Sequence, residues 1–110
     1  MILPNAEKAV VDIGKLRDYC LNPNHDVGKH KARVFVAALS LYSQDALVLR
    51  GALLEAVKSN EAIHGTANEF GQRYIVDFDM EYNGKTARIR SIWIINTGSG
   101  IPRLISSYVL

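Results

Sequence analysis

The fold of this chain is decided by residues 72–96, QRYIVDFDMEYNGKTARIRSIWIIN. Two stretches of alternating polarity, Gln72–Tyr82 and Thr86–Asn96, flank the dipeptide Asn83-Gly84. Alternation with a period of two is typical of a strand with one buried face. Asn-Gly between two such stretches favours a hairpin with a two-residue turn, because both residues tolerate the positive φ angles that this turn requires.

A two-residue turn also fixes which residues face each other across the hairpin. The expected buried face holds five cross-strand pairs: Tyr82 with Lys85, Met80 with Ala87, Phe78 with Ile89, Val76 with Ser91, and Tyr74 with Trp93. The opposite face pairs Glu81 with Thr86, Asp79 with Arg88, and Asp77 with Arg90. Two ion pairs thus follow from a register chosen on turn chemistry alone, and each contributes a few tenths of a kcal/mol, on the order of 0.2–1.

The residues before the hairpin carry helical apolar periodicity, and those around it form further strands. Asp12 is an expected N-cap for the first helix. Gly51, inside the third helix, costs about 1 kcal/mol relative to alanine, which indicates close packing at that position. The expected elements are helices over 13–21, 29–41 and 46–59 and strands over 62–70 and 103–110. The sequence therefore predicts one α+β domain spanning 1–110, with three N-terminal helices packed on one face of a three- to four-stranded antiparallel meander sheet.

Composition narrows the functional classes. With 110 residues, 48% hydrophobic residues and a net charge of +2, the chain can bury a core but is not basic enough to coat nucleic acid indiscriminately. The single cysteine, Cys20, forms no intrachain disulfide and is expected to be a buried small hydrophobe. The three histidines lack metal-ligand spacing, so neither a metal nor a cofactor is expected. No apolar segment has signal-peptide or transmembrane character, which predicts a cytoplasmic protein without membrane contact.

The loop NPNHDVGKHKAR at residues 22–33 concentrates basic residues at the start of the second helix. Lys29, His30, Lys31 and Arg33 lie within five positions there. Cations at the positive end of a helix dipole are unfavourable, and a bound anion relieves that repulsion. The loop therefore indicates a polyanionic ligand, with RNA the favoured class.

Cleavage of RNA through its 2′-hydroxyl needs a base, an acid and cations, and it needs no metal. The candidate catalytic residues are His30, Arg90, Ser106 and Tyr108. The candidate substrate-binding residues are Lys29, Lys31, Arg33 and Arg88. Trp93 or Tyr74 would stack a base.

Each candidate also has a structural interpretation. His30 is equally explained as a solvated neighbour of a helix start, and the basic residues of the loop as a solvated face. Arg88 and Arg90 pair with aspartates in the expected register, and Trp93 and Tyr74 fall on the core face. The alternative function is a non-catalytic protein- or anion-binding module that uses an edge strand or the basic loop. The last strand is a candidate edge for pairing into a homodimer, which fits either function.

Several segments resemble a family of small bacterial proteins of unknown function. The clearest are GKHKARVF at Gly28–Phe35 and PRLISSY at Pro102–Tyr108. The resemblance implies a neighbouring gene for another small protein, as in a toxin–antitoxin module, and hence a small antitoxin-like partner. The expected order of helices before a sheet is also similar to the superfamily of barnase, EndoU, colicin and RelE-like RNase toxins. That second resemblance implies a metal-independent RNase-like toxin that places Lys or His on an N-terminal helix and Arg, Ser or Tyr on the strands.

Overall fold

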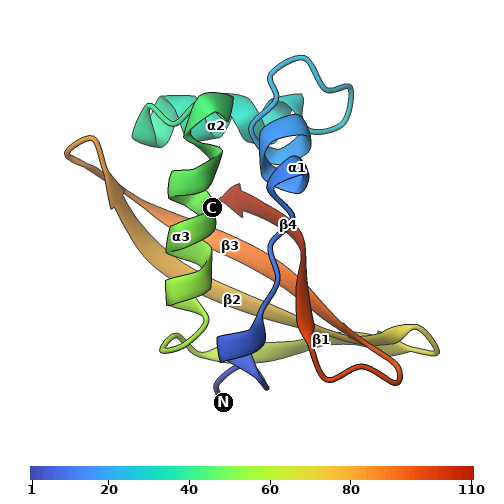
Figure 1. Cartoon of the computed structure of the whole chain (residues 1–110). Helices are drawn as coiled ribbons and strands as arrows, with labels where there is room; N and C mark the ends of the chain where they lie inside the picture. The colour runs from blue at the N-terminus through green and yellow to red at the C-terminus, as the bar shows by residue number, and fades with distance from the viewer.

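The computed structural model describes residues 1–110, and its helices precede its strands (Figure 1). The helical part comprises η1 (Ala6–Lys8), α1 (Ile13–Lys15), the π-helical turn η2 (Leu16–Cys20), α2 (Lys29–Leu39), η3 (Ser43–Asp45) and α3 (Ala46–Ala56). The strands are β1 (Ala62–Asn68), β2 (Gly71–Tyr82), β3 (Lys85–Asn96) and β4 (Pro102–Val109). They form one antiparallel sheet in the order β1-β2-β3-β4. The predicted α+β class and meander are therefore confirmed.

The predicted hairpin register is confirmed at every pair. Tyr82 lies opposite Lys85, and the ladder continues without a break to Gly71 opposite Asn96. Asn83 has a φ of 55° and Gly84 a φ of 71°, so both turn residues are left-handed, as the favoured two-residue turn demands. Turn chemistry that is local in sequence thus set the pairing of two twelve-residue strands.

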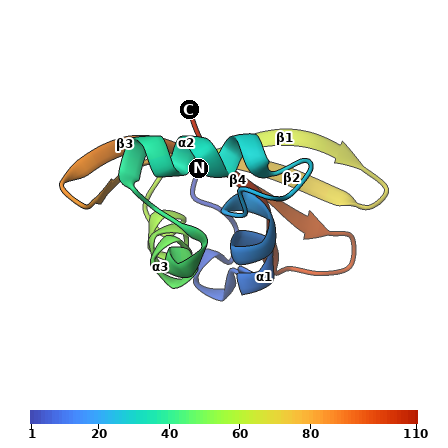
Figure 2. The same ribbon diagram turned by 90° about the horizontal axis from the view of Figure 1, so that it is seen from above.

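The helices are not arranged identically with respect to the sheet. Figure 2 shows α1 and α3 on the same side of the sheet, while α2 lies across its end. The C-terminal end of α2 is attached to the β2–β3 turn, because Asn83 Nδ2 donates to the carbonyl oxygens of Leu39 and Ser40 at 2.9 and 3.1 Å. Lys85 Nζ adds a hydrogen bond to Ser40 Oγ at 3.0 Å. The other face of the sheet carries no helix (Figure 2).

The core lies where the sheet packs against η2, α2 and α3, which contribute among others Leu16, Phe35 and Leu53, and Trp93 is fully buried in it. Trp93 Nε1 donates to Ser91 Oγ at 2.9 Å, and that hydroxyl donates to the Val76 carbonyl at 2.7 Å. A buried indole needs such a partner. Tyr74 is also buried, so both aromatic residues belong to the predicted core face and neither is free to stack a base.

Some expectations about the helices need correction. Gly51 is exposed, and a Cβ placed there would have no atom within 4 Å, so the interpretation as a close-packing site is wrong. Asp12 does cap α1, accepting from the Gly14 amide at 2.9 Å, but the first helix is α-helical only to Lys15. No single helix is both long and apolar enough to span a membrane; Lys29–Leu39 taken with Ser43–Ala56, bent by 77°, meets the test by length and composition alone.

The last strand is an edge strand, as expected, but its edge is covered at the N-terminal end of β4. Val10 pairs with Arg103 in parallel, donating to the Pro102 carbonyl at 2.9 Å and accepting from the Leu104 amide at 3.0 Å. Homodimerisation through the full length of β4 would require this N-terminal segment to leave. The homodimer remains a prediction.

Candidate functional site

One basic side chain of α2 turns inward and gathers hydroxyl groups from two other elements. Lys31 Nζ donates to Tyr19 Oη of η2 at 3.0 Å and to Ser106 Oγ of β4 at 2.9 Å. The same nitrogen lies 4.9 Å from the ring centroid of Tyr19 and 5.4 Å from that of Tyr108. We call Tyr19, Lys31, Ser106 and Tyr108 the Lys31 cluster. A half-buried ammonium between two aromatic rings is stabilised by cation–π attraction as well as by hydrogen bonds.

The position of Lys31 follows from the phase of α2. Lys31 is four residues before Phe35 and eight before Leu39, and both of these are fully buried. Residues four apart lie on one helix face, so Lys31 borders the buried stripe. Gly28, just before the helix, is packed so closely that a Cβ there would collide with the Tyr19 carbonyl oxygen. Glycine at this position thus brings the start of α2 against η2.

Tyr19 is presented by an unusual stretch of helix. Residues Leu16–Cys20 form a π-helical turn, a rare element that occurs frequently at functional sites. The edge of the Tyr19 ring also contacts His25, with centroids 4.9 Å apart and planes at 85°. His25 Nδ1 accepts from the amides of Val27 and Gly28 at 3.0 Å each, so this histidine shapes the loop that leads into α2.

Cys20, next to Tyr19, lies beneath the Lys31 cluster and is fully buried, as expected. Burial raises the pKa of the Cys20 thiol above its usual value, and the Ser107 amide and the Lys31 charge oppose that effect only in part. A thiol that stays protonated is a poor nucleophile. Cys20 is therefore a packing residue of the site.

Arg90 lies directly opposite Tyr108 on the neighbouring strand. Its guanidinium donates two hydrogen bonds to the Asp77 carboxylate, both at 2.9 Å. This bidentate bond raises the pKa of Arg90 above its usual range, with a smaller contribution from Tyr108, and the same bond lowers the pKa of Asp77. Arg88 pairs with Asp79 at 3.2 Å in a more exposed position. Both arginines thus make the ion pairs that the register predicts.

The structure does not bring every candidate to the Lys31 cluster. Ser106, Tyr108 and Arg90 lie at the cluster or beside it. His30 and Arg33 are exposed on α2, Lys29 is half-buried, and none of the three makes a side-chain hydrogen bond. Successive residues of a helix differ by about 100° in direction around its axis. The His30 side chain therefore points away from the direction in which Lys31 reaches the cluster.

Tyr19 was not predicted as a site residue, and Lys31 was predicted only as one of several surface cations. The signal for Lys31 was present in the sequence, since a lysine at a position four residues before a core phenylalanine lies beside the apolar stripe. Tyr19 carried no such signal, because its approach to Lys31 depends on the π-helical turn and on the contact at Gly28.

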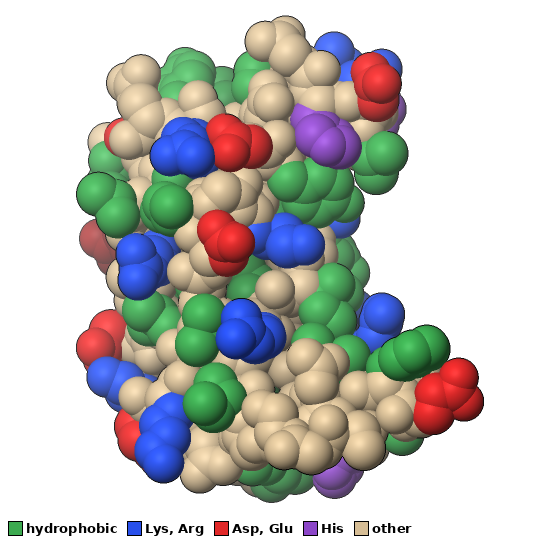
Figure 3. Space-filling view, turned by 45° about the vertical axis from the view of Figure 1, so that its right-hand side comes forward, with side chains coloured by type: hydrophobic (Ala, Val, Ile, Leu, Met, Phe, Trp, Pro, Cys, Tyr) green, Lys and Arg blue, Asp and Glu red, His purple; other side chains and the backbone are tan.

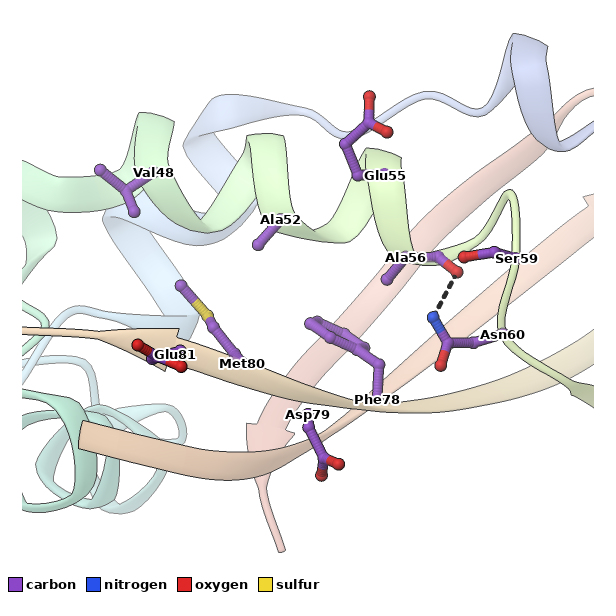
Figure 4. A pocket seen from close by; sticks show the side chains of 10 residues that line it. All are labelled: Val48, Ala52, Glu55, Ala56, Ser59, Asn60, Phe78, Asp79, Met80 and Glu81. Atoms are coloured by element: carbon purple, nitrogen blue, oxygen red, sulfur yellow. Dashed lines mark hydrogen bonds between the residues drawn. The ribbon is translucent and has the colours of Figure 1, made fainter. Parts of the chain in front are cut away.

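The one sizeable hollow of the molecule lies elsewhere, between α3 and β2 (Figure 4). This groove of about 410 Å³ has an apolar floor, with Glu55, Asp79 and Glu81 among its lining residues and no lysine or arginine. A site that binds phosphate is lined by basic residues, whereas this groove is lined by acidic ones. In Figure 3, the Lys and Arg side chains are spread over the visible face among hydrophobic and acidic ones rather than gathered in one patch. No group of three or more His, Cys, Asp or Glu residues is arranged to hold a metal ion.

These features define a small α+β domain with an open antiparallel sheet and a lysine–hydroxyl cluster at its last strand. The chain belongs to the family described as "Domain of unknown function (DUF6883)", which it matches over residues 2–110. The predicted membership of a family of unknown function is thereby confirmed. No curated protein sequence matches the chain.

Among solved structures, the chain is similar to one from the "Contact-dependent growth inhibition toxin - immunity protein complex from Klebsiella pneumoniae 342". The TM-score is 0.68 at 17% sequence identity, and the likeness covers 93% of this chain and 100% of that chain. At this identity the comparison shows a shared fold.

Proposed function

We propose that the chain is a metal-independent ribonuclease that acts in the cytoplasm as the toxin of a two-gene toxin–antitoxin module. The observation that carries the proposal is the Lys31 cluster, in which an ammonium group and three hydroxyl side chains meet at the last strand. The fold shared with a chain of a toxin–immunity protein complex supports a role in such a two-protein pair, and with it a small cognate partner protein.

The chemistry requires charge stabilisation and proton transfer. A base takes the proton of a ribose 2′-hydroxyl as its oxygen attacks the adjacent phosphorus, and negative charge grows on the phosphoryl oxygens. The bond from phosphorus to the 5′-oxygen breaks as an acid gives that oxygen a proton; His30 fills one of these two roles and water the other. The products are a 2′,3′-cyclic phosphate and a 5′-hydroxyl. The Lys31 ammonium is fixed in position before the substrate arrives, so it stabilises this charge without reorganisation. The Tyr108 hydroxyl, with Ser106 beside it, binds a phosphoryl oxygen.

The exposed basic residues have supporting roles in this proposal. His30 is free of intramolecular partners but points away from Lys31, so the proposal has it act as the acid or base on RNA that passes over the start of α2 and reaches both side chains. Lys29 and Arg33, on the same helix, bind flanking phosphates, as do Arg88 and Arg90 from the sheet. Because Arg90 is already paired with Asp77, it presents to RNA only the part of its guanidinium that the carboxylate leaves free.

The decisive experiment is cleavage of total cellular RNA by the purified chain in excess chelator. We expect Lys31→Ala to reduce the cleavage rate by about 10²–10³-fold, as the loss of one charge-stabilising donor does in other enzymes. His30→Ala should reduce it by about 10²–10⁴-fold, the usual contribution of a general acid or base. Lys8→Ala removes a comparable charge from η1, far from the Lys31 cluster in sequence, and serves as the matched control. Full activity of both Lys31→Ala and His30→Ala would refute the proposal.

A second candidate function is a non-catalytic protein- or anion-binding module. The observation that favours it is that the Lys31 cluster lines no groove, since the one groove of the molecule is acidic and lies at α3 and β2. Folded wild-type chain, free of any partner, that leaves RNA intact would support this function instead.

A further inference from the structure

Strand β2 extends well beyond its neighbour β1. The β1–β2 pairing ends where Ala62 lies opposite Val76, but β2 continues to Tyr82. The segment Asp77–Tyr82 therefore has β3 on one side and no strand on the other. We call this segment the free edge of β2.

The hairpin register shows which backbone groups this edge offers. A two-residue turn closes on a hydrogen-bonded pair, Tyr82 with Lys85, and bonding alternates along an antiparallel ladder. Phe78 and Met80 thus bond to β3, and the N–H and C=O groups of Asp79 and Glu81 point outward. Natural proteins usually block such an edge with charged side chains, above all lysine, with proline or with a bulge. The only charges here are the carboxylates of Asp77, Asp79 and Glu81, which oppose an acidic strand but not a basic one. Residues 77–82 contain no lysine, proline or bulge.

The free edge borders the groove described above, and Figure 4 shows the two together. Phe78 and Met80 point from β2 towards α3, where Ala52 and Ala56 face them. Phe78 and Met80 are only 3% and 5% exposed, so they form a shallow apolar floor, and Val48, 38% exposed, is the most open apolar residue of the lining.

The groove also has a defined charge. Glu55, Asp79 and Glu81 belong to its lining, which contains no lysine or arginine. Asp79 and Glu81 alternate with Phe78 and Met80 along β2, so their side chains lie on the helix-free face and make the free edge acidic on that face (Figure 4). Glu55 pairs with Lys58 at 3.2 Å and Asp79 with Arg88 at 3.2 Å, but both pairs are exposed and such pairs are weak. Glu81 has no ion pair, so the groove has a net acidic lining.

We propose that the free edge of β2 and the adjoining groove bind an extended segment of a partner protein in which apolar side chains alternate with Lys or Arg. The segment would lie in line with β1 and bond to the backbone of Asp79 and Glu81. Its apolar side chains would pack on the α3 wall of the groove at Val48 and Ala52, beside Phe78 and Met80, and a basic side chain on its other face would reach Glu81. This surface is separate from the Lys31 cluster, so the inference does not depend on the proposed function.

Charge argues against a second copy of this chain as the occupant. Pairing of two free edges would set aspartates and glutamates of one copy against those of the other, and like charges directly opposite are destabilising. The exposed edge strand β1, AIHGTAN at residues 62–68, carries no lysine or arginine to match the groove. A basic strand from a different protein satisfies both the hydrogen-bonding groups and the charge.

The test is binding of a fluorescent synthetic peptide, Lys-Val-Lys-Ile-Lys-Val-Lys, to the full chain by anisotropy. We expect saturable binding that Glu81→Lys weakens by up to about fivefold, since an exposed charge contact contributes up to roughly that factor. Glu69→Lys makes the same charge change at the turn between β1 and β2 and should leave binding unchanged. Hydrogen exchange should slow at the amides of Asp79 and Glu81 when the peptide is bound.

Each contrary result overturns a stated part of the proposal. Equal binding of a peptide with Glu in place of Lys excludes charge recognition, and unchanged exchange at Asp79 and Glu81 excludes edge pairing. Equal weakening by Glu69→Lys reduces the binding to unspecific attraction. A dimer in sedimentation that Glu81→Lys disrupts makes a second copy the occupant. Lys31→Ala should bind the peptide normally, which separates this test from that of the proposed ribonuclease.

Discussion

Two serines that face each other across β3 and β4 should differ in what their replacement by alanine does to the free energy of unfolding: one replacement should lower it and the other should not. Ser91 and Ser107 are cross-strand partners, and both are fully buried. Ser91 Oγ accepts from Trp93 Nε1 and donates to the Val76 carbonyl, whereas Ser107 Oγ has no hydrogen-bond partner. Removing a satisfied buried hydroxyl leaves its partners unpaired, and removing an unsatisfied one relieves a desolvation cost.

The magnitude follows from the burial of Trp93. Ser91→Ala leaves an indole N–H without a partner at a fully buried site, which costs on the order of 2 kcal/mol. Unfolding entropy of about 2.1 cal/mol/K per residue converts this to a fall in Tm of about 9 °C for a chain of this length. Ser107→Ala should leave the free energy of unfolding unchanged or raise it by up to about 1 kcal/mol.

The assay is urea unfolding of both variants and of Ser91→Ala placed in a Trp93→Phe background. Phenylalanine has no N–H to satisfy, so Ser91→Ala should cost at least about 1 kcal/mol less in that background. Equal costs in the two backgrounds, or a Ser107→Ala variant as unstable as Ser91→Ala, would refute this account of the core.

Three further predictions concern the rest of the structure. Gly51→Ala should raise the free energy of unfolding by about 1 kcal/mol, because the site is exposed, helical and empty around the added methyl; a fall in Tm by calorimetry would contradict this. Asp77→Asn should be less stable than wild type at neutral pH. The hydrogen bond from Arg90 lowers the pKa of folded Asp77, so its contribution is lost as pH falls, and the gap should narrow below about pH 4 in urea titrations. Cys20 should resist iodoacetamide in the native chain and react once urea unfolds it, and rapid native labelling would show that the thiol is accessible.

The hairpin was predictable because all of its determinants are local in sequence. Asn83-Gly84 sets the turn, the period of two sets the faces, and the pairs Asp77–Arg90 and Asp79–Arg88 check the register independently. The C-terminal end of β1 was less certain from the sequence. A strand to Phe70 was expected, and the structure ends it at Asn68, whose side chain accepts a hydrogen bond from the Phe70 amide.

The candidate site was harder to predict because its geometry depends on tertiary contacts. The concentration of cations at the start of α2 was visible, and the spacing from Phe35 marked Lys31 as the cation beside the buried stripe, but its partner Tyr19 depended on the approach of Gly28 to η2. At Gly51 the sequence misled in the other direction. The helix-propensity cost of glycine suggested close packing at this position, but the structure has no atom within 4 Å of a Cβ placed there. The free edge of β2 could not be predicted. It exists because β1 begins at Ala62, opposite Val76, and no sequence pattern in Asp77–Tyr82 encodes where the neighbouring strand begins.

The distance between the free edge of β2 and the Lys31 cluster determines whether a partner bound at the edge would also cover the cluster. The free edge of β2 and the Lys31 cluster at β4 lie on either side of β3, and two interstrand spacings amount to about 10 Å. A peptide that pairs with β2 adds a strand in the plane of the sheet and leaves Ser106 and Tyr108 uncovered. A folded partner of ordinary size buries about 800 Å² on each side, an area that extends well beyond one strand. The same edge contact thus blocks access to the Lys31 cluster only when a whole domain is attached to the docked segment.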